Sequence, residues 1–177
     1  MNITVYCGVS EGNKPEYKQA AIDLGLWMAR AGHRLVYGGG GIGMMGALSD
    51  TIIENGGDVL GIIPQFLVER EQLNVHLEHS IIVETMSERK KLLYENADAF
   101  VMLPGGIGSF EEITEVLSQK KLGFIEAPVY IVNIEGCYDH FIAALHDIVD
   151  NGFLLPEESP FIAVRSVEEL AQIIDRH

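Results

Sequence analysis

Short apolar runs alternate with longer amphipathic segments along the whole chain. The runs have the length and residue types of β-strands, and the segments between them repeat apolar residues at the spacing of a helix face. Strands are expected over residues 3–7, 35–37, 59–63, 80–83, 99–103, 129–132 and 161–164. Helices are expected over residues 15–31, 44–55, 87–96 and 138–150, after the turn at 104–108, and from residue 167. This alternation predicts an α/β fold, Rossmann-like and doubly wound, with a mostly parallel sheet and helices on both faces.

Local signals support several of these boundaries. Pro15 suits the first turn of a helix, and Gly32 suits the position after a helix ends. Ser166 is placed to cap the last helix, with Glu169 three residues later as its partner. Residues 65–79 are polar and not periodic, and a loop of that length is expected to cover a functional site. No linker or repeat interrupts the chain, so one domain is expected over residues 1–177.

The charge balance narrows the classes of partner. Twelve basic against 26 acidic side chains give a formal net charge of −14, which disfavours nucleic acids and anionic membrane surfaces. A small anionic ligand stays compatible if a few cations are concentrated at one place. The N-terminus lacks a signal-peptide pattern and no apolar run reaches the length of a membrane span, so a cytoplasmic protein is expected. Cys7 and Cys137 have no metal-binding spacing, and Cys7 is expected to be a buried, reduced thiol.

A glycine-rich turn follows the expected strand at 99–103 and opens a helix. Its sequence is Pro104-Gly105-Gly106-Ile107-Gly108-Ser109-Phe110-Glu111-Glu112. Glycine lets the backbone approach a ligand closely, and the first amides of a helix have no partner inside the helix. These N–H groups and the helix dipole favour an anion, most often a phosphate. We expect a phosphate to bind the amides of Gly106, Gly108 and Ser109 and the hydroxyl of Ser109.

Three glutamates follow this turn, at Glu111, Glu112 and Glu115. Carboxylates beside an anion site repel the ligand, so they have either a chemical task or a position facing solvent as favourable first-turn residues. The glutamates alone leave both interpretations open. The glycine turn and the basic residues upstream favour chemistry.

A second glycine pattern, Gly38-x-Gly40-x-x-Gly43, matches the dinucleotide-binding fingerprint. A dinucleotide site has this fingerprint after the first strand and an acidic residue at the end of the next. Here the loop follows the second expected strand, and Asp58 precedes the third. The pattern therefore favours close approach to a smaller ligand, or tight packing against a neighbouring loop, over a nicotinamide cofactor.

The stretch Met86-Ser87-Glu88-Arg89-Lys90 opens the helix before the strand at 99–103. Consecutive basic residues usually form a solvated face. In an acidic chain, a basic pair at a helix start beside a strand's carboxyl end can also meet an anion. Arg89 can then fork onto a phosphate or a sugar hydroxyl. The residues alone leave both alternatives open.

Three motifs taken together resemble the LOG (LONELY GUY) family of cytokinin riboside 5′-monophosphate phosphoribohydrolases, long mislabelled lysine decarboxylases. The motifs are Val36-Tyr37-Gly38-Gly39-Gly40, Met86-x-x-Arg89-Lys90 and Pro104-Gly105-Gly106-x-Gly108-Ser109-x-x-Glu112, and the likeness covers nearly the whole chain. The resemblance implies hydrolysis of the N-glycosidic bond of a nucleoside 5′-monophosphate, AMP or an N6-substituted AMP, to free base and ribose 5-phosphate. It also implies no metal or other cofactor, and a homodimer or larger assembly.

By this resemblance, Arg89 is the catalytic arginine and Glu112 the glutamate that closes the family's motif. The implied or candidate substrate-binding residues are Glu71, Lys90, Gly105, Gly106, Ile107, Gly108, Ser109, Phe110, Glu111, Glu115, Gly39 and Gly40. The sequence departs from the family pattern at Ser109, which replaces a threonine, and at Ser87, which replaces a histidine or glutamine. Ser118-Gln119 replaces a Thr-Trp pair, which bears on base preference or subunit contact.

The implied chemistry suits the residues independently of the family. Cleavage of a ribosyl–base bond passes through a ribose with oxocarbenium character, which a nearby carboxylate stabilises while it orients or deprotonates water. Glu112 is the candidate for this task, and Glu111 or Glu115 for accepting bonds from ribose hydroxyls. Arg89 would hold the substrate.

Three rival functions have different requirements. A non-catalytic nucleotide-binding module would keep the glycine loops without needing Arg89 and Glu112 together. A lysine decarboxylase would need a lysine that forms a Schiff base with pyridoxal phosphate, and the chain is short for such an enzyme. His76 and His79 lie in a polar stretch, which is a weak basis for a metal site.

Overall fold

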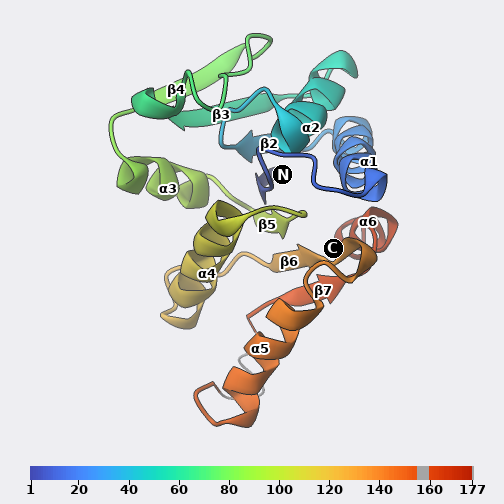
Figure 1. The fold of residues 1–177 in the computed structure, drawn as a ribbon, viewed down its shortest axis with the longest axis vertical. Coiled ribbons are helices and arrows are strands. Elements are labelled where there is room, and N and C mark those ends of the chain that lie inside the picture. Colours follow the sequence, from blue (N-terminus) through green and yellow to red (C-terminus); the bar gives the residue numbers. More distant parts are fainter. Residues whose placement is uncertain (155–159, 177) are drawn as a thin grey trace.

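The computed structural model describes residues 1–154 and 160–176 (Figure 1). Within these residues, strands form one sheet in the order β4-β3-β2-β1-β5-β6-β7. The strands are β1 (Asn2–Tyr6), β2 (Arg34–Tyr37), β3 (Val59–Pro64), β4 (His79–Val83), β5 (Ala99–Met102), β6 (Val129–Val132) and β7 (Ile162–Val164). Every neighbouring pair is parallel, which confirms the fold class that the alternating pattern predicted.

Helices cover both faces of the sheet (Figure 1). One face carries α1 (Pro15–Ala31), α2 (Gly43–Glu54) and α6 (Val167–Ile174). The other carries α3 (Met86–Glu95), α4 (Ile107–Lys121) and α5 (Asp139–Asp150). The predicted helix ends are close to the observed ones: Gly32 follows α1 with φ of 70°, and Ser166 Oγ accepts from the Glu169 amide at 3.1 Å. None of these helices has the length and hydrophobicity that crossing a membrane requires.

Residues of β1 alternate between two buried layers. Ile3 and Val5 pack with the layer of α1 and α2, whereas Tyr6 packs with the layer of α3 and α4. Thr4 is fully buried and donates its hydroxyl hydrogen to the Leu93 carbonyl at 2.7 Å. Because parallel strands are covered on both faces, their sequences are nearly continuous apolar runs.

The strand order reverses beside β1. The chain builds β2, β3 and β4 on one side of β1, and then returns to build β5, β6 and β7 on the other. The connection after β1 leads to α1 on one face, whereas the connection after β5 leads to α4 on the opposite face. Ligands of such sheets bind in the crevice that this divergence opens at the carboxyl ends of the strands. Both glycine loops lie at carboxyl ends of strands, as predicted.

Residues 65–79 are not a loop throughout, in contrast to the prediction. Gln65–Leu67 form a 3₁₀ helix, η1, and His79 already belongs to β4. A second short 3₁₀ helix, η2, covers Ile134–Gly136. Residues 68–77, here called the covering segment, run back over the first glycine loop. The Gly41 amide donates to the Gln72 carbonyl there at 2.7 Å.

Candidate active site

A cavity of about 300 Å³ lies at the carboxyl ends of β1, β2 and β5. It is at the reversal of strand order, where the fold predicts a ligand. Its walls come from the end of β1, the first glycine loop, the covering segment, the start of α3 and the start of α4. Its ionisable side chains are Tyr6, Cys7, Glu71, Arg89, Glu111 and Glu112.

The residues of the predicted phosphate site line this cavity. Gly106 is the N-cap of α4 and no side chain caps the helix, so the amides of Ile107, Gly108 and Ser109 have no partner within it. All three residues line the cavity, and Ser109 is buried. Gly105 lies directly against the Ser109 hydroxyl, where a Cβ would collide with it. The helix start therefore presents backbone donors and one hydroxyl to an anion.

Arg89 is buried rather than solvated. A capping box between Thr85 and Glu88 fixes the start of α3 and directs Arg89 into the protein, where it is 5% exposed. Its Nε donates to the Ile62 carbonyl at 3.1 Å. Its Nη2 donates to the Gly38 carbonyl at 3.0 Å and to Glu71 Oε2 at 3.2 Å. Nη1 contacts only a weak acceptor within the described residues, the Met86 sulfur at 4.0 Å, and so keeps donor capacity for a ligand.

The first glycine loop makes room for that guanidinium. A Cβ at Gly38 would occupy the position of Arg89 Nη2. Gly39, with φ of 80°, packs against Ile63, and Gly40 packs against the covering segment. Gly39 and Gly40 do not line the cavity. Gly39 and Gly40 thus have packing contacts, whereas Gly38 of the same loop lines the cavity beside Arg89. Direct contact of Gly39 or Gly40 with a substrate stays a prediction.

Glu112 is partly buried in the cavity wall. Burial is the largest cause that raises the pKa of its carboxyl group; Arg89 and Lys90 lower this pKa, the charges of Glu111 and Glu71 raise it, and the net value is about 7. A carboxyl group with this pKa exchanges its proton near neutral pH, which suits general acid–base chemistry.

Lys90 holds the other two glutamates of α4. Its Nζ lies 2.6 Å from Glu111 Oε1 and 2.7 Å from Glu115 Oε2. Hydrogen bonds to these carboxylates raise the pKa of Lys90 to about 12. Glu111 still reaches the cavity, whereas Lys90, Glu115 and Phe110 do not line it. Phe110 instead packs edge-on against Tyr138, with ring centroids 5.4 Å apart.

Several cavity residues carried no assignment from the sequence. Tyr6 ends β1, is buried and stacks on Phe100 with centroids 6.4 Å apart. Burial and the charge of Glu112 raise the pKa of its hydroxyl. The position of Tyr6 at the carboxyl end of a strand could have indicated a place in the site. Only the pairing of the strands, however, shows that β1 lies in the middle of the sheet. Cys7 is free and buried, as predicted.

A second cavity of about 310 Å³ adjoins the first across Gly8 and Gly106. It is lined by Gly105, Tyr17, Cys137 and other residues of the loops after β1 and β5. The glycine turn at 104–108 therefore lies between the two cavities, and Gly105 lines the second one.

The histidine pair suggested for a metal does not form a site. His76 Nδ1 lies 3.2 Å from Asp50 Oδ1. In residues 1–154 and 160–176, no group of three or more His, Cys, Asp or Glu side chains is arranged to hold a metal ion.

Fold and cavity together define a Rossmann-like α/β protein with an uncapped helix start beside a carboxyl group of raised pKa and a buried arginine. Known structures share this fold. One is the X-ray structure of TM1055, with a TM-score of 0.76 and 25% identity over 99% of each chain. Another is the molybdenum cofactor carrier protein of Chlamydomonas reinhardtii, with a TM-score of 0.74 and 19% identity over 99% of this chain and 96% of that one.

Sequence comparison identifies the family. The family model described as "Possible lysine decarboxylase" matches residues 45–176. Cytokinin riboside 5′-monophosphate phosphoribohydrolase LOG1 of Arabidopsis thaliana is 38% identical, over 99% of this chain and 84% of that protein. The phosphoribohydrolase LOG of Oryza sativa subsp. japonica is 41% identical, over 86% of this chain and 63% of that protein. The chain belongs to the LOG family.

Proposed function

We propose that the protein hydrolyses the N-glycosidic bond of a nucleoside 5′-monophosphate to free base and ribose 5-phosphate. The substrate class is AMP or an N6-substituted AMP, the cytokinin riboside 5′-monophosphates for which its relatives are named. The observation that carries the proposal is one cavity that joins Glu112, with its pKa of about 7, to Arg89 and to the free amides of α4.

In this proposal the 5′-phosphate binds the start of α4. The amides of Ile107, Gly108 and Ser109 donate to it, together with the Ser109 hydroxyl. The phosphate then fixes the ribose beside Glu112, one turn further along the same helix. Binding energy from a group remote from the reacting bond is used here to position the ribosyl carbon.

Glu112 acts in its ionised form. Its negative charge stabilises the ribosyl cation that develops as the bond to the base breaks. The oxygen of a water molecule forms the new bond to the ribosyl carbon, and Glu112 accepts the proton that this water loses. The electron pair of the broken bond leaves with the base nitrogen, which takes up a proton from solvent, and Glu112 returns to its ionised form by releasing the proton that it accepted from the attacking water. The products are therefore balanced by one water molecule, without a redox step.

Arg89 and Lys90 have separate tasks in this mechanism. Arg89 presents Nη1 to the substrate, while its other nitrogens bind Ile62, Gly38 and Glu71. Lys90 neutralises charge on Glu111 and Glu115, which reduces their repulsion of the phosphate. Glu111, at the cavity wall, is then the acceptor for a ribose hydroxyl.

The test is product analysis on AMP, an N6-substituted AMP and adenosine at equal concentration. The phosphorylated compounds should release base while adenosine releases almost none, and added ribose 5-phosphate should inhibit. Comparable release from adenosine would contradict the phosphate site and indicate an ordinary nucleosidase. Binding of AMP without release of any base would indicate a non-catalytic nucleotide-binding module.

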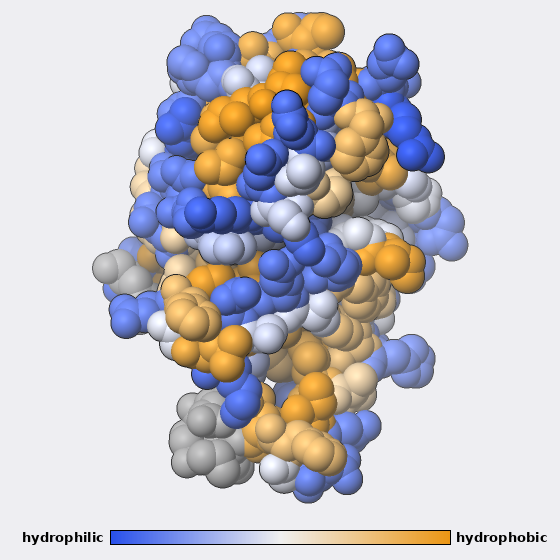
Figure 2. All heavy atoms as spheres, turned by 90° about the vertical axis from the view of Figure 1, so that its left-hand side faces the viewer, coloured by the Kyte–Doolittle hydropathy of each residue, from blue (hydrophilic) through white to orange (hydrophobic). Residues whose placement is uncertain are grey.

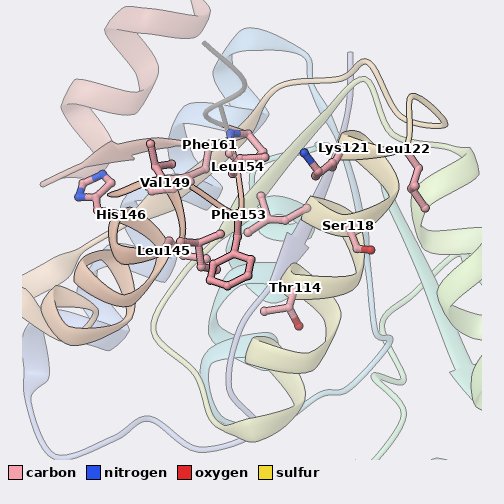
Figure 3. Close-up of a pocket in the computed structure, with 13 residues that line it drawn as sticks. Thr114, Ser118, Lys121, Leu122, Leu145, His146, Val149, Phe153, Leu154 and Phe161 are labelled. Carbon is pink, nitrogen blue, oxygen red and sulfur yellow. The ribbon is translucent and has the colours of Figure 1, made fainter. Parts of the chain in front are cut away.

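We also propose that the protein is a cytoplasmic homodimer, in which a second copy covers an apolar groove of about 290 Å³ between α4 and α5. Figure 3 shows Leu145 and Val149 of α5 on one side and Thr114 and Ser118 of α4 on the other, with Phe153 between them. Hydrophobic residues gather in both the upper and the lower half of the face shown in Figure 2.

Exposure of large apolar residues supports this location. Of the residues that line the groove, Phe153 is 79% exposed and Leu122 64% exposed. Phe124, two residues after Leu122 in the chain, is 76% exposed. Contiguous apolar surface of this kind marks protein–protein interfaces. Leu122→Glu should convert a dimer to a monomer in light scattering, whereas Val75→Glu, at an 87% exposed position elsewhere, should not. An unchanged mass for Leu122→Glu would place the interface on another face.

A further inference from the structure

A buried asparagine fastens the covering segment to α2. Asn74 is 5% exposed, and its Nδ2 donates to Ser49 Oγ and to Asp50 Oδ1, both at 2.8 Å. Its Oδ1 accepts from the His76 amide at 2.9 Å. Both ends of the side-chain amide are thus satisfied in the interior, where an unpaired polar group is costly.

The backbone of the same residue joins the covering segment to the first glycine loop. The Asn74 amide donates to the Gly39 carbonyl at 2.9 Å, and the Gly41 amide donates to the Gln72 carbonyl at 2.7 Å. An antiparallel bridge joins the two segments between these bonds. Asn74 therefore lies where the covering segment, the glycine loop and α2 meet.

Both joined segments supply acceptors to Arg89. Gly38, which precedes the bonded glycines, accepts from Nη2 at 3.0 Å. Glu71, three residues before Asn74, accepts from the same nitrogen at 3.2 Å. A shift of the covering segment would separate Glu71 from Arg89 and release the guanidinium from one of its supports.

We propose that Asn74 is a positioning residue for the reaction: it fixes the covering segment on α2 and thereby holds Glu71 against Arg89. Asn74 does not itself line the cavity. The inference rests on the proposed function, in which Arg89 contacts the substrate. No sequence pattern indicates this role, because Asn74 lies in a polar stretch and its partners are 24 and 25 residues away.

Asn74→Ala removes the side-chain bonds and leaves the cavity wall unaltered in composition. We expect kcat/KM for AMP to fall about 10- to 100-fold, because small displacements of a positioned catalytic group have effects of this order. Asn55→Ala is the matched control. Asn55 caps the end of α2 and its Nδ2 donates to the Thr51 carbonyl at 2.8 Å in an exposed position, so its removal should leave kcat/KM unchanged.

A double-mutant cycle with Glu71→Gln tests whether Asn74 acts through Glu71. If it does, the double variant should lose no more than the more damaged single variant, since both substitutions break one unit. Losses that multiply would overturn the inference. So would a lower melting temperature for Asn74→Ala with kcat/KM of the folded protein unchanged, since that result indicates a purely structural role.

If Asn74→Ala does not fold, the contact between Asn74 and Asp50 can be tested by exchanging the donor and the acceptor between these two residues. N74D alone places a carboxylate against Asp50 and should lower kcat/KM as far as the alanine variant. N74D/D50N restores one donor opposite one acceptor and should regain most of the lost activity. Absence of any recovery would overturn the contact as the source of the effect.

Limited proteolysis separates failure of this inference from failure of the proposed function. Arg70 is exposed in the covering segment, so trypsin reports opening of that segment even if no nucleotide is hydrolysed. Cleavage after Arg70 should accelerate about 10-fold or more in Asn74→Ala, because local opening exposes the bond, and should not change in Asn55→Ala. Unchanged cleavage in Asn74→Ala would overturn the inference whatever the enzyme assay gives.

Discussion

Glu112→Gln separates the contribution of Glu112 to the reaction from its cost to the fold. Burial raises the pKa of the carboxyl group from an ordinary value of 4.5 to about 7. Between these values the folded protein holds a proton that the unfolded chain has lost, so stability falls as the pH rises through this interval. A pKa difference of this size corresponds to at most about 3 kcal/mol at pH 8, because the side of Glu112 that faces the cavity stays in contact with water.

Glutamine keeps the shape and carries no charge. The variant should therefore unfold with a free energy about 1–3 kcal/mol larger than wild type at pH 8, and the difference should decline to about a quarter of that at pH 5. Turnover of AMP should fall about 10²- to 10³-fold, which corresponds to the loss of ~3–4 kcal/mol of transition-state stabilisation. Affinity for AMP should stay the same or increase, since one negative charge is removed beside the phosphate.

Denaturant unfolding at pH 5, 6, 7 and 8 measures the first effect, and chromatography of the released base measures the second. Glu95→Gln is the control, because Glu95 is an exposed residue at the end of α3 that should affect neither quantity. Near-normal turnover in Glu112→Gln would remove this residue from the mechanism. A stability difference that does not vary with pH would show that the carboxyl group is not held at a raised pKa.

Three further predictions concern the same cavity. Arg89→Lys should lower kcat/KM at least about 100-fold in a protein that still folds, because a point charge cannot bind Ile62 and Gly38 at once as the guanidinium fork does; a variant that keeps most of its rate would show that only diffuse positive charge matters. Gly38→Ala should reproduce the kinetic defect of Arg89→Lys, since its methyl group would occupy the position of the guanidinium, and wild-type kinetics would contradict the placement of Arg89. The pH profile of kcat/KM should rise to a plateau with an apparent pKa near 7, because Glu112 must lose its proton to act; a rate that is already maximal at pH 5 would assign the reaction to another group.

The role of a site residue could be predicted from the sequence where that role depends on the residues next to it in the chain. The turn at 104–109 is such a case, because a strand, glycines and an uncapped helix start are adjacent in the chain, as predicted, and the binding of an anion there stays a prediction. Arg89 is the contrary case. Its neighbours Lys90 and Lys91 suggested a solvated face, and only the approach of Gly38 and Glu71 in space shows that it is buried.

The helices, the strands and the parallel sheet could be predicted from the sequence, but the order of the strands could not. Apolar runs and helical periodicity gave the elements, and their alternation gave the parallel sheet. The strand order could not be read, because strands buried on both faces have nearly the same pattern whichever neighbours they pair with. The extent of one domain over residues 1–177 stays a prediction, and residues 155–159 and 177 lie outside the described part.

The central place of β1 has a consequence for how the chain is made. Ile3 pairs with Leu35 on one side of the sheet and with Ala99 on the other. During synthesis, β2 therefore becomes available long before β5 leaves the ribosome. At translation rates of about 5–20 residues per second, one edge of β1 waits several seconds for its partner. An unpaired strand edge is a template for pairing with another chain. Exposure of this edge of β1 to misassembly is thus confined to that interval of translation, and the open edge passes to β5 when β5 is added.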